Sequence, residues 1–378
     1  MYAVETKMRY FKKWGSGFII PLLLIPHLIL SQHALRSDTI APASIYSIGL
    51  ATHYGFVFVH SKEVKNTQGS KPWGIELDFN KQLLKNESWD ECHCFPRTGI
   101  VLSYFNLDNN DLGHSFNAAI YIEPFINPSH RVKVSMKGAA GLSWLTNPYH
   151  ETTNPENKSY SMALNAYLGL GLGVNFKISR KIHAKFSAYY NHISNGGLKD
   201  PNYGINWPTL TVQAFYLINP APLPLREKDK NVNYKNKPLR KDIILYLTQK
   251  NDYAIWGGGF AVSKQISGMN ALTLGTEVTS DHALEKRMEE DEVEDKNYVY
   301  AGLLAGHEFL MGRFNFSQQI GVYIYKDNDY YNALYQRYGL MYSISKLLSF
   351  GVNLKAHGKE ANFLDGRIVL SLRGKKKL

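Results

Sequence analysis

Residues 162–178 read MALNAYLGLGLGVNFKI, and this stretch decides the fold class. Its even positions, from Met162 to Ile178, are apolar without exception, whereas most of its odd positions are glycine or polar. Successive side chains of a β-strand point to opposite faces of the sheet. The pattern therefore predicts a long strand with one apolar face and one polar, glycine-rich face.

The same alternation recurs at residues 131–144, 314–324 and 348–356. Strands of soluble proteins usually have about five or six residues. These stretches are longer, as a tilted strand that crosses a bilayer must be. A closed barrel is the arrangement that leaves no unpaired strand edge in lipid. We therefore favour an all-β fold, an antiparallel transmembrane β-barrel with its apolar face toward lipid, over a soluble β-protein.

Sixteen candidate strands can be counted, near 45–60, 73–80, 97–107, 115–126, 131–146, 160–178, 182–195, 206–218, 242–250, 254–266, 270–282, 297–309, 313–325, 333–345, 347–357 and 363–373. Long outer connections, such as 147–159, alternate with short inner ones, as in outer-membrane barrels. We predict one barrel of more than eight strands, about 14–16, over residues 45–373. Residues 219–241, rich in proline and lysine, form a linker or a large loop between 45–218 and the further strands of 242–373.

The first 31 residues have the pattern of a secretory signal peptide. Four basic residues precede the apolar run FIIPLLLIPHLIL at 18–30, which is too short to span a bilayer as a helix. A retained N-terminal anchor is the alternative. The chain of 378 residues has no later apolar run long enough for a membrane helix, and its formal net charge is +11. An exported barrel without helical spans is expected in the outer membrane of a Gram-negative bacterium.

One predicted hairpin, 182–218, carries polar residues on its lipid-facing phase. His192 and Ser194 continue the apolar even positions of the first strand, and Asn206 belongs to the apolar phase of the second. A hairpin centred on Asp200 would pair Ser194 with Asn206, and His192 with Pro208. A serine, a histidine that takes its proton and a third group that fixes the imidazole are the parts of a serine hydrolase. The alternative is that polar residues gather here because the membrane interface is wet.

The segment His192-Ile-Ser194-Asn195-Gly196, followed by PNYGIN at 201–206, resembles the active-site segment of the outer-membrane lipid A deacylases, also labelled acyloxyacyl hydrolases. The motif covers about 15 residues, and the flanking pattern extends the likeness over 45–218. The resemblance implies an eight-stranded barrel that removes an ester-linked acyl chain from lipid A. It implies Ser194 as nucleophile, His192 as base, and Asn195 with the Gly196 N–H in the oxyanion hole.

The residue that would fix the imidazole departs from that family. The family has a glutamate twelve residues after the serine, where this chain has Asn206. The outer-membrane phospholipase A family has an asparagine there, so phospholipase A is the alternative function. The residues after 218 lie outside the smaller family's fold. A second alternative is not an enzyme at all: a porin-like channel without catalysis, since a glycine-rich lumen would permit one.

The remaining features concern ligands and partners. We expect lipopolysaccharide or lipid A as the substrate, in a membrane-embedded protein, with basic loop residues meeting its phosphates, and no nucleic-acid partner. No cofactor is expected, and calcium enters only under the phospholipase alternative. Cys92 and Cys94 form a loop disulfide or free thiols rather than a metal site. The acidic run 289–295 is expected to be a solvated loop, and the oligomeric state is left open.

Overall fold

The computed structural model describes residues 42–92, 94–126, 132–224, 234–293, 297–328, 330–358 and 360–373. The predicted signal peptide, 1–31, lies outside these ranges. The first eight strands are β1 Ser44–Gly55, β2 Trp73–Leu83, β3 Arg97–Asn106, β4 His114–Glu123, β5 Val132–Leu145, β6 Leu164–Lys177, β7 Ile182–Ser194 and β8 Ile205–Leu217. The second eight are β9 Arg240–Lys250, β10 Tyr253–Gln265, β11 Asn270–Asp281, β12 Val299–Met311, β13 Phe314–Tyr325, β14 Leu334–Ser343, β15 Leu348–His357 and β16 Glu360–Arg373.

Short helical segments occupy four connections: η1 Lys62–Thr67, α1 Asn86–Cys92, η2 Tyr234–Asn236 and α2 His282–Glu290. No helix in the described ranges is long and apolar enough to cross a membrane. Cys92, the last residue of α1, forms a disulfide with Cys94, which was one of the predicted alternatives. Part of the predicted acidic loop, Glu289 and Glu290, belongs instead to the last turn of α2.

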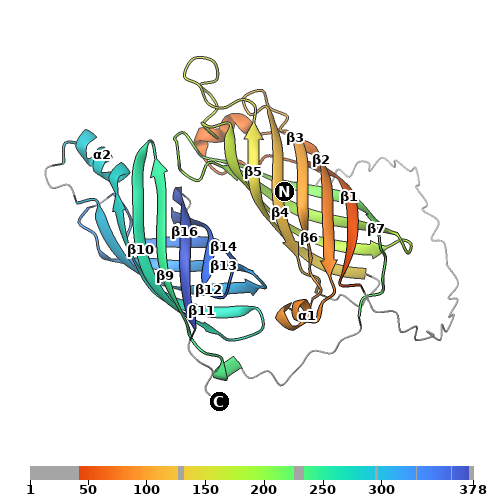
Figure 1. Cartoon of the computed structure of the whole chain (residues 1–378). Helices are drawn as coiled ribbons and strands as arrows, with labels where there is room; N and C mark the ends of the chain where they lie inside the picture. Colours follow the sequence, from red (N-terminus) through yellow and green to blue (C-terminus); the bar gives the residue numbers. More distant parts are fainter. Residues whose placement is uncertain are drawn as a thin grey trace, which may run out of the picture. The chain divides into compact units, whose positions relative to one another are not determined.

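The strands close into two barrels of eight, not one barrel of sixteen (Figure 1). In the first barrel β8 pairs with β1, with Phe215 opposite Gly49. In the second, β16 pairs with β9, with Val369 opposite Ile244. The all-β antiparallel barrel class and all sixteen strands are confirmed, but the prediction of a single barrel is wrong. Pairing β8 with β1 satisfies both open edges after eight strands, so no edge remains for β9.

The outward faces of both barrels are apolar, as the alternation predicts. Leu170 and Leu210 on the first barrel are 58% and 73% exposed, and Leu274 on the second is 66% exposed. A barrel that carries such side chains on every strand and polar side chains inside has the pattern of an outer-membrane barrel. The predicted lipid-facing phase is therefore confirmed for both halves of the chain.

The lumen of the first barrel is filled by paired charges. Lys137 Nζ lies 2.8 Å from Glu76 Oε1, and Lys185 Nζ lies 2.6 Å from Glu123 Oε1. All four side chains are at most 2% exposed. Buried charges that are paired in this way fill the barrel instead of leaving a water-filled channel.

The glycines of β6 serve this packing and do not widen a pore. A Cβ at Gly171 would lie 2.3 Å from Tyr189 Cδ2, and one at Gly173 would lie 2.5 Å from Lys185 Cε. The bare backbone of β6 therefore makes room for Tyr189 and Lys185 inside the barrel. This use of the glycine-rich face argues against the porin-like channel.

Candidate active site

The predicted hairpin consists of β7 and β8, which place His192 and Ser194 at the end of β7. Their neighbours Asn191 and Ile193 are completely buried in the barrel, whereas Tyr190 is 42% exposed on the outer face. His192 and Ser194 share the phase of Tyr190 and therefore lie on the lipid-facing side of the barrel wall. The structure confirms the predicted phase of these two residues.

The register of the hairpin differs from the prediction by two residues. His192 lies directly opposite Asn206, and Tyr190, not His192, lies opposite Pro208. The pairing of Ser194 with Asn206 was therefore wrong, and the correction brings Asn206 closer to the imidazole. Residues directly opposite each other in an antiparallel pair have neighbouring side chains.

Three of the predicted residues form one hydrogen-bonded row. His192 Nδ1 lies 2.7 Å from Asn206 Oδ1, and His192 Nε2 lies 3.0 Å from Ser194 Oγ. Both distances are those of well-formed hydrogen bonds. One ring nitrogen of His192 therefore faces the serine hydroxyl and the other faces an amide.

A fourth residue, His60, extends this row and was missed in the sequence. Asn206 Nδ2 lies 2.9 Å from His60 Nδ1, and His60 Nε2 lies 2.8 Å from the carbonyl oxygen of Tyr203. The β1–β8 ladder brings His60 here, because Phe58 N donates to Asn206 O beyond the end of β1. His60 and Asn206 are 146 residues apart and no local motif joins them, so only the closure of the barrel could reveal the contact.

The row has one consistent direction of donors and acceptors. The Tyr203 carbonyl can only accept, so His60 Nε2 carries a proton. Nδ1 of the neutral ring then accepts from the Asn206 amide at 2.9 Å, while the Phe58 carbonyl lies farther from the same nitrogen, at 3.5 Å. The Asn206 amide nitrogen then donates to His60, and its oxygen accepts from His192 Nδ1–H. This leaves His192 Nε2 without a proton, facing the Ser194 hydroxyl. The imidazole is thus set as a base toward the serine.

The turn after Ser194 is organised by Asn195, whose side chain is buried. Asn195 Oδ1 accepts from the backbone N–H groups of Gly197 and Leu198, and its Nδ2 donates to the carbonyl oxygen of Lys199. The side-chain amide predicted for an oxyanion hole is therefore committed to the turn. The N–H of Gly196 has no hydrogen-bond partner among the described residues.

Gly204 lies against the imidazole and has a left-handed backbone, with φ of 77°. A Cβ at this position would lie 3.0 Å from His192 Cε1 and 3.4 Å from Ser194 Cβ. Gly204 N also donates to the carbonyl oxygen of Ser159 at 2.7 Å, which ties the β7–β8 connection to the β5–β6 connection. Glycine here meets both the backbone conformation and the lack of space beside the ring.

No group of three or more His, Cys, Asp or Glu side chains within the described ranges is placed to hold a metal ion. The arrangement that the structure does contain is a hydroxyl, an imidazole and an amide in a row, with His192 and Ser194 partly exposed. Such a row can activate the hydroxyl as a nucleophile.

Comparison with known proteins gives two family models that match the chain. Residues 47–214 match the lipid A 3-O-deacylase model (PagL), and residues 232–374 match the acyloxyacyl hydrolase C-terminal domain (PagL_C). No curated protein matches the chain.

Among solved structures, the chain is similar to the outer membrane enzyme PagL, with 17% identity and a TM-score of 0.33, over 44% of this chain and 97% of that one. It is also similar to Neisserial surface protein A, with 10% identity and a TM-score of 0.30, over 47% and 99% of the two chains. A mutant porin of Rh. blastica gives 9% identity and a TM-score of 0.19, over 86% and 100%.

The two family models together take in both barrels, and each ends close to a barrel boundary. The chain, an outer-membrane β-barrel protein, belongs to the PagL family of lipid A 3-O-deacylases, which hydrolyse ester bonds.

Proposed function

We propose that the chain is a serine esterase that removes an ester-linked acyl chain from lipid A at the lipid-facing wall of its first barrel. Ser194 is the nucleophile, His192 is the general base and then the general acid, and Asn206 orients the imidazole. The observation that carries the proposal is the direction of the hydrogen-bonded row, which leaves His192 Nε2 as an acceptor 3.0 Å from Ser194 Oγ.

The chemistry proceeds in two steps. His192 Nε2 takes the hydroxyl proton as Ser194 Oγ attacks the ester carbonyl carbon, and the imidazolium then protonates the departing alkoxide of the sugar. The acyl-enzyme is hydrolysed by a water molecule that His192 deprotonates, which releases the fatty acid and restores the serine. The free N–H of Gly196 is our candidate donor to the oxyanion of both tetrahedral intermediates.

The neutral amide of Asn206 affects the energetics of these steps. It can hold the imidazole by a hydrogen bond, but it does not stabilise an imidazolium as a carboxylate would. This is the feature that supports phospholipase A as the second candidate, in which case calcium enters as a cofactor. Under either candidate the same three side chains do the chemistry, so the substrate must be tested separately.

Exposed lysines on the connections around the site suit an anionic lipid headgroup. Lys62 and Lys71 lie on the β1–β2 connection, and Lys199 lies five residues after Ser194. Ammonium groups at these positions would meet the phosphates of lipid A while its acyl chains stay in the bilayer.

The test is release of fatty acid from purified lipopolysaccharide and, in parallel, from phospholipid, measured by mass spectrometry. Ser194→Ala and His192→Ala should each lower release by about 10⁴-fold or more, because nucleophile and base act as a unit. Both variants should keep the heat-modifiable gel migration of the folded barrel. A Ser194→Ala protein as active as the parent would exclude the catalytic assignment, and cleavage of phospholipid alone would select the second candidate.

A further inference from the structure

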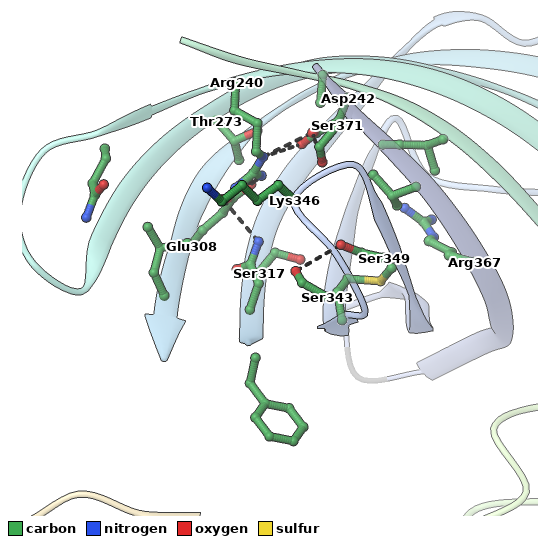
Figure 2. Close-up of a pocket in the computed structure, with 18 of the residues that line it drawn as sticks. Arg240, Asp242, Thr273, Glu308, Ser317, Ser343, Lys346, Ser349, Arg367 and Ser371 are labelled. Carbon is green, nitrogen blue, oxygen red and sulfur yellow. Dashed lines mark hydrogen bonds and ion pairs between the residues drawn. The ribbon is translucent and has the colours of Figure 1, made fainter. Parts of the chain in front are cut away.

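The second barrel contains a cavity of about 550 Å³ at one end of its lumen (Figure 2). The turns at Gly268, Gly312 and Lys346 lie at its mouth, together with Tyr234 and Lys237 from the segment before β9. The volume is in the range of pockets that bind small molecules, about 300–1,000 Å³. None of the groups proposed for catalysis lies in this barrel.

The cavity is closed at its inner side by a layer of charged side chains. Arg337, completely buried, lies 2.7 Å from Asp365 and 3.0 Å from Glu277 across the lumen. The cavity reaches as far as Arg367, whose Nε donates to Asp365 at 2.6 Å. This network fills the middle of the barrel, so the cavity does not continue through it as an open channel.

The opposite end of the lumen is covered by α2 and by tyrosines. Leu284, Met288 and Tyr300 form a buried cluster there, and Asp281 accepts hydrogen bonds from Tyr300 and Tyr331. The charged network and the α2 cluster both lie between the cavity and the far end of the lumen, so the cavity is a cup with a single opening. Such a cup can hold a ligand but cannot serve as a channel through the barrel.

The charges inside the cup are already paired with one another. Arg240 bonds to Asp242 at 2.8 Å and to Glu308 at 2.8 Å, and Ser371 donates to Asp242 (Figure 2). These carboxylates therefore have partners within the protein. They do not make the cup a site for a cation.

Two neutral groups in the lining have no such partner. Thr273 is 2% exposed, and its hydroxyl has no hydrogen-bond partner in the described part of the chain; the same is true of the buried Oδ1 of Asn315. Leaving a buried hydroxyl unpaired costs roughly as much as losing a hydrogen bond. A ligand that carries hydroxyl groups would satisfy both atoms.

The mouth of the cup is basic. Lys346 is exposed on the β14–β15 turn, and Lys237 precedes β9. The lining contains four basic side chains, Lys237, Arg240, Lys346 and Arg367, against two acidic ones, Asp242 and Glu308. The excess positive charge lies at the rim, where it would attract and hold an anionic group.

We propose that the second barrel is a binding module whose cup takes an anionic, hydroxyl-rich ligand of saccharide size, a sugar that carries a phosphate or a carboxylate. The hydroxyls enter toward Thr273 and Asn315, and the anionic group stays near Lys346. Because the second barrel has an even number of strands, β9 begins and β16 ends on the same side of it, and the short turns that form the mouth of the cup lie on that side. In outer-membrane barrels the short turns face the periplasm, so the cup opens to the periplasm.

The experiment is calorimetric titration of the full-length refolded protein in detergent with four probes: glucose 6-phosphate, glucuronate, glucose and inorganic phosphate. At least one of the two anionic sugars should bind with a dissociation constant of about 1 mM or lower. Glucose and inorganic phosphate should each bind at least about tenfold more weakly, because each satisfies only one half of the site.

Two variants locate the binding. Lys346→Gln should weaken the anionic sugars by about threefold to tenfold and leave glucose unchanged. Thr273→Val, which keeps the side-chain shape, should weaken every sugar by about tenfold. The matched controls are Lys181→Gln on an inner turn of the first barrel and Thr276→Val on the outer face of β11, both exposed, and neither should change binding.

The outcomes are distinct. Failure of both anionic sugars to bind at 10 mM (about tenfold above the expected dissociation constant) would overturn the proposal. So would binding that Lys346→Gln and Thr273→Val leave unchanged, because the ligand would then lie elsewhere. Lys346 lies on an exposed turn, so its variant reports on the cup even if Thr273→Val fails to fold.

Discussion

Replacement of Asn206 by leucine is the perturbation that tests the hydrogen-bonded row most directly. Leucine has a similar shape but neither accepts from His192 Nδ1 nor donates to His60, so it removes contacts of 2.7 Å and 2.9 Å. In the free enzyme the bond to His192 joins two neutral groups and contributes about 0.5–1.5 kcal/mol. In the transition state of the proposed mechanism the ring is an imidazolium, and a bond to a charged group contributes about 1.5–3 kcal/mol.

The difference of roughly 1–1.5 kcal/mol is the part that lowers the barrier, and it corresponds to about a tenfold loss of kcat. Rotation of the unrestrained ring adds to this, up to about 100-fold in all. KM should change little, because Asn206 does not contact the substrate in the proposed mechanism. The assay is fatty acid release from lipopolysaccharide in mixed micelles, with Asn110→Leu on an exposed outer connection as the matched control.

Two results would refute the reasoning. A loss below about threefold would mean that the amide does not hold the imidazole during the reaction. A loss as large as that of Ser194→Ala would mean that Asn206 takes part in the chemistry and does not merely orient His192. Asn206→Glu supplies the carboxylate found in the lipid A deacylases at this position, and it should retain or raise activity if the site works by their geometry.

Two glycine substitutions test the packing, each against a glycine with open space around it. Gly204→Ala should lower activity by about tenfold or more without unfolding the barrel, because its Cβ would lie 3.0 Å from His192 Cε1. The control is Gly69→Ala, where φ is similarly positive but no atom lies within 4 Å of the added Cβ. This control should cost only the backbone strain, about 1–2 kcal/mol in unfolding free energy. Gly171→Ala should lower the temperature at which heat-modifiable migration is lost, because its Cβ would lie 2.3 Å from Tyr189, whereas Gly138→Ala, with nothing within 4 Å, should not. If Gly204→Ala lowers activity no more than Gly69→Ala does, the close contact with His192 does not limit function. If Gly171→Ala lowers stability no more than Gly138→Ala does, the contact with Tyr189 does not limit stability.

The strands could be predicted because each is a local pattern. All sixteen follow from the period-two alternation, and the phase of His192 and Ser194 follows from the same count. Closure could not be predicted, because eight-stranded and sixteen-stranded barrels need the same alternation along each strand. Which strand β8 pairs with depends on contacts between residues such as Gly49 and Phe215, far apart in the chain. The proline- and lysine-rich segment 219–241 was the signal for a boundary.

The site was predictable only in part, for a similar reason. His192, Ser194 and Asn206 belong to one hairpin and share a recognisable spacing. The hairpin register was misjudged because Asn195 orders the turn through bonds to Gly197, Leu198 and Lys199, which shifts the centre of the hairpin from Asp200. His60 lies on the extension of β1, and only the pairing of β1 with β8 brings it to Asn206.

The outward position of Ser194 determines how a substrate reaches it. His192 and Ser194 share the phase of Tyr190 on the barrel wall, so under the proposed function a lipid substrate arrives by lateral diffusion within its leaflet and need not be extracted into water. The concentration that governs turnover is then a surface density, the mole fraction of substrate among the surrounding lipids. Dilution of the leaflet with inert lipid should slow the reaction at constant total substrate, whereas dilution of the whole suspension should not.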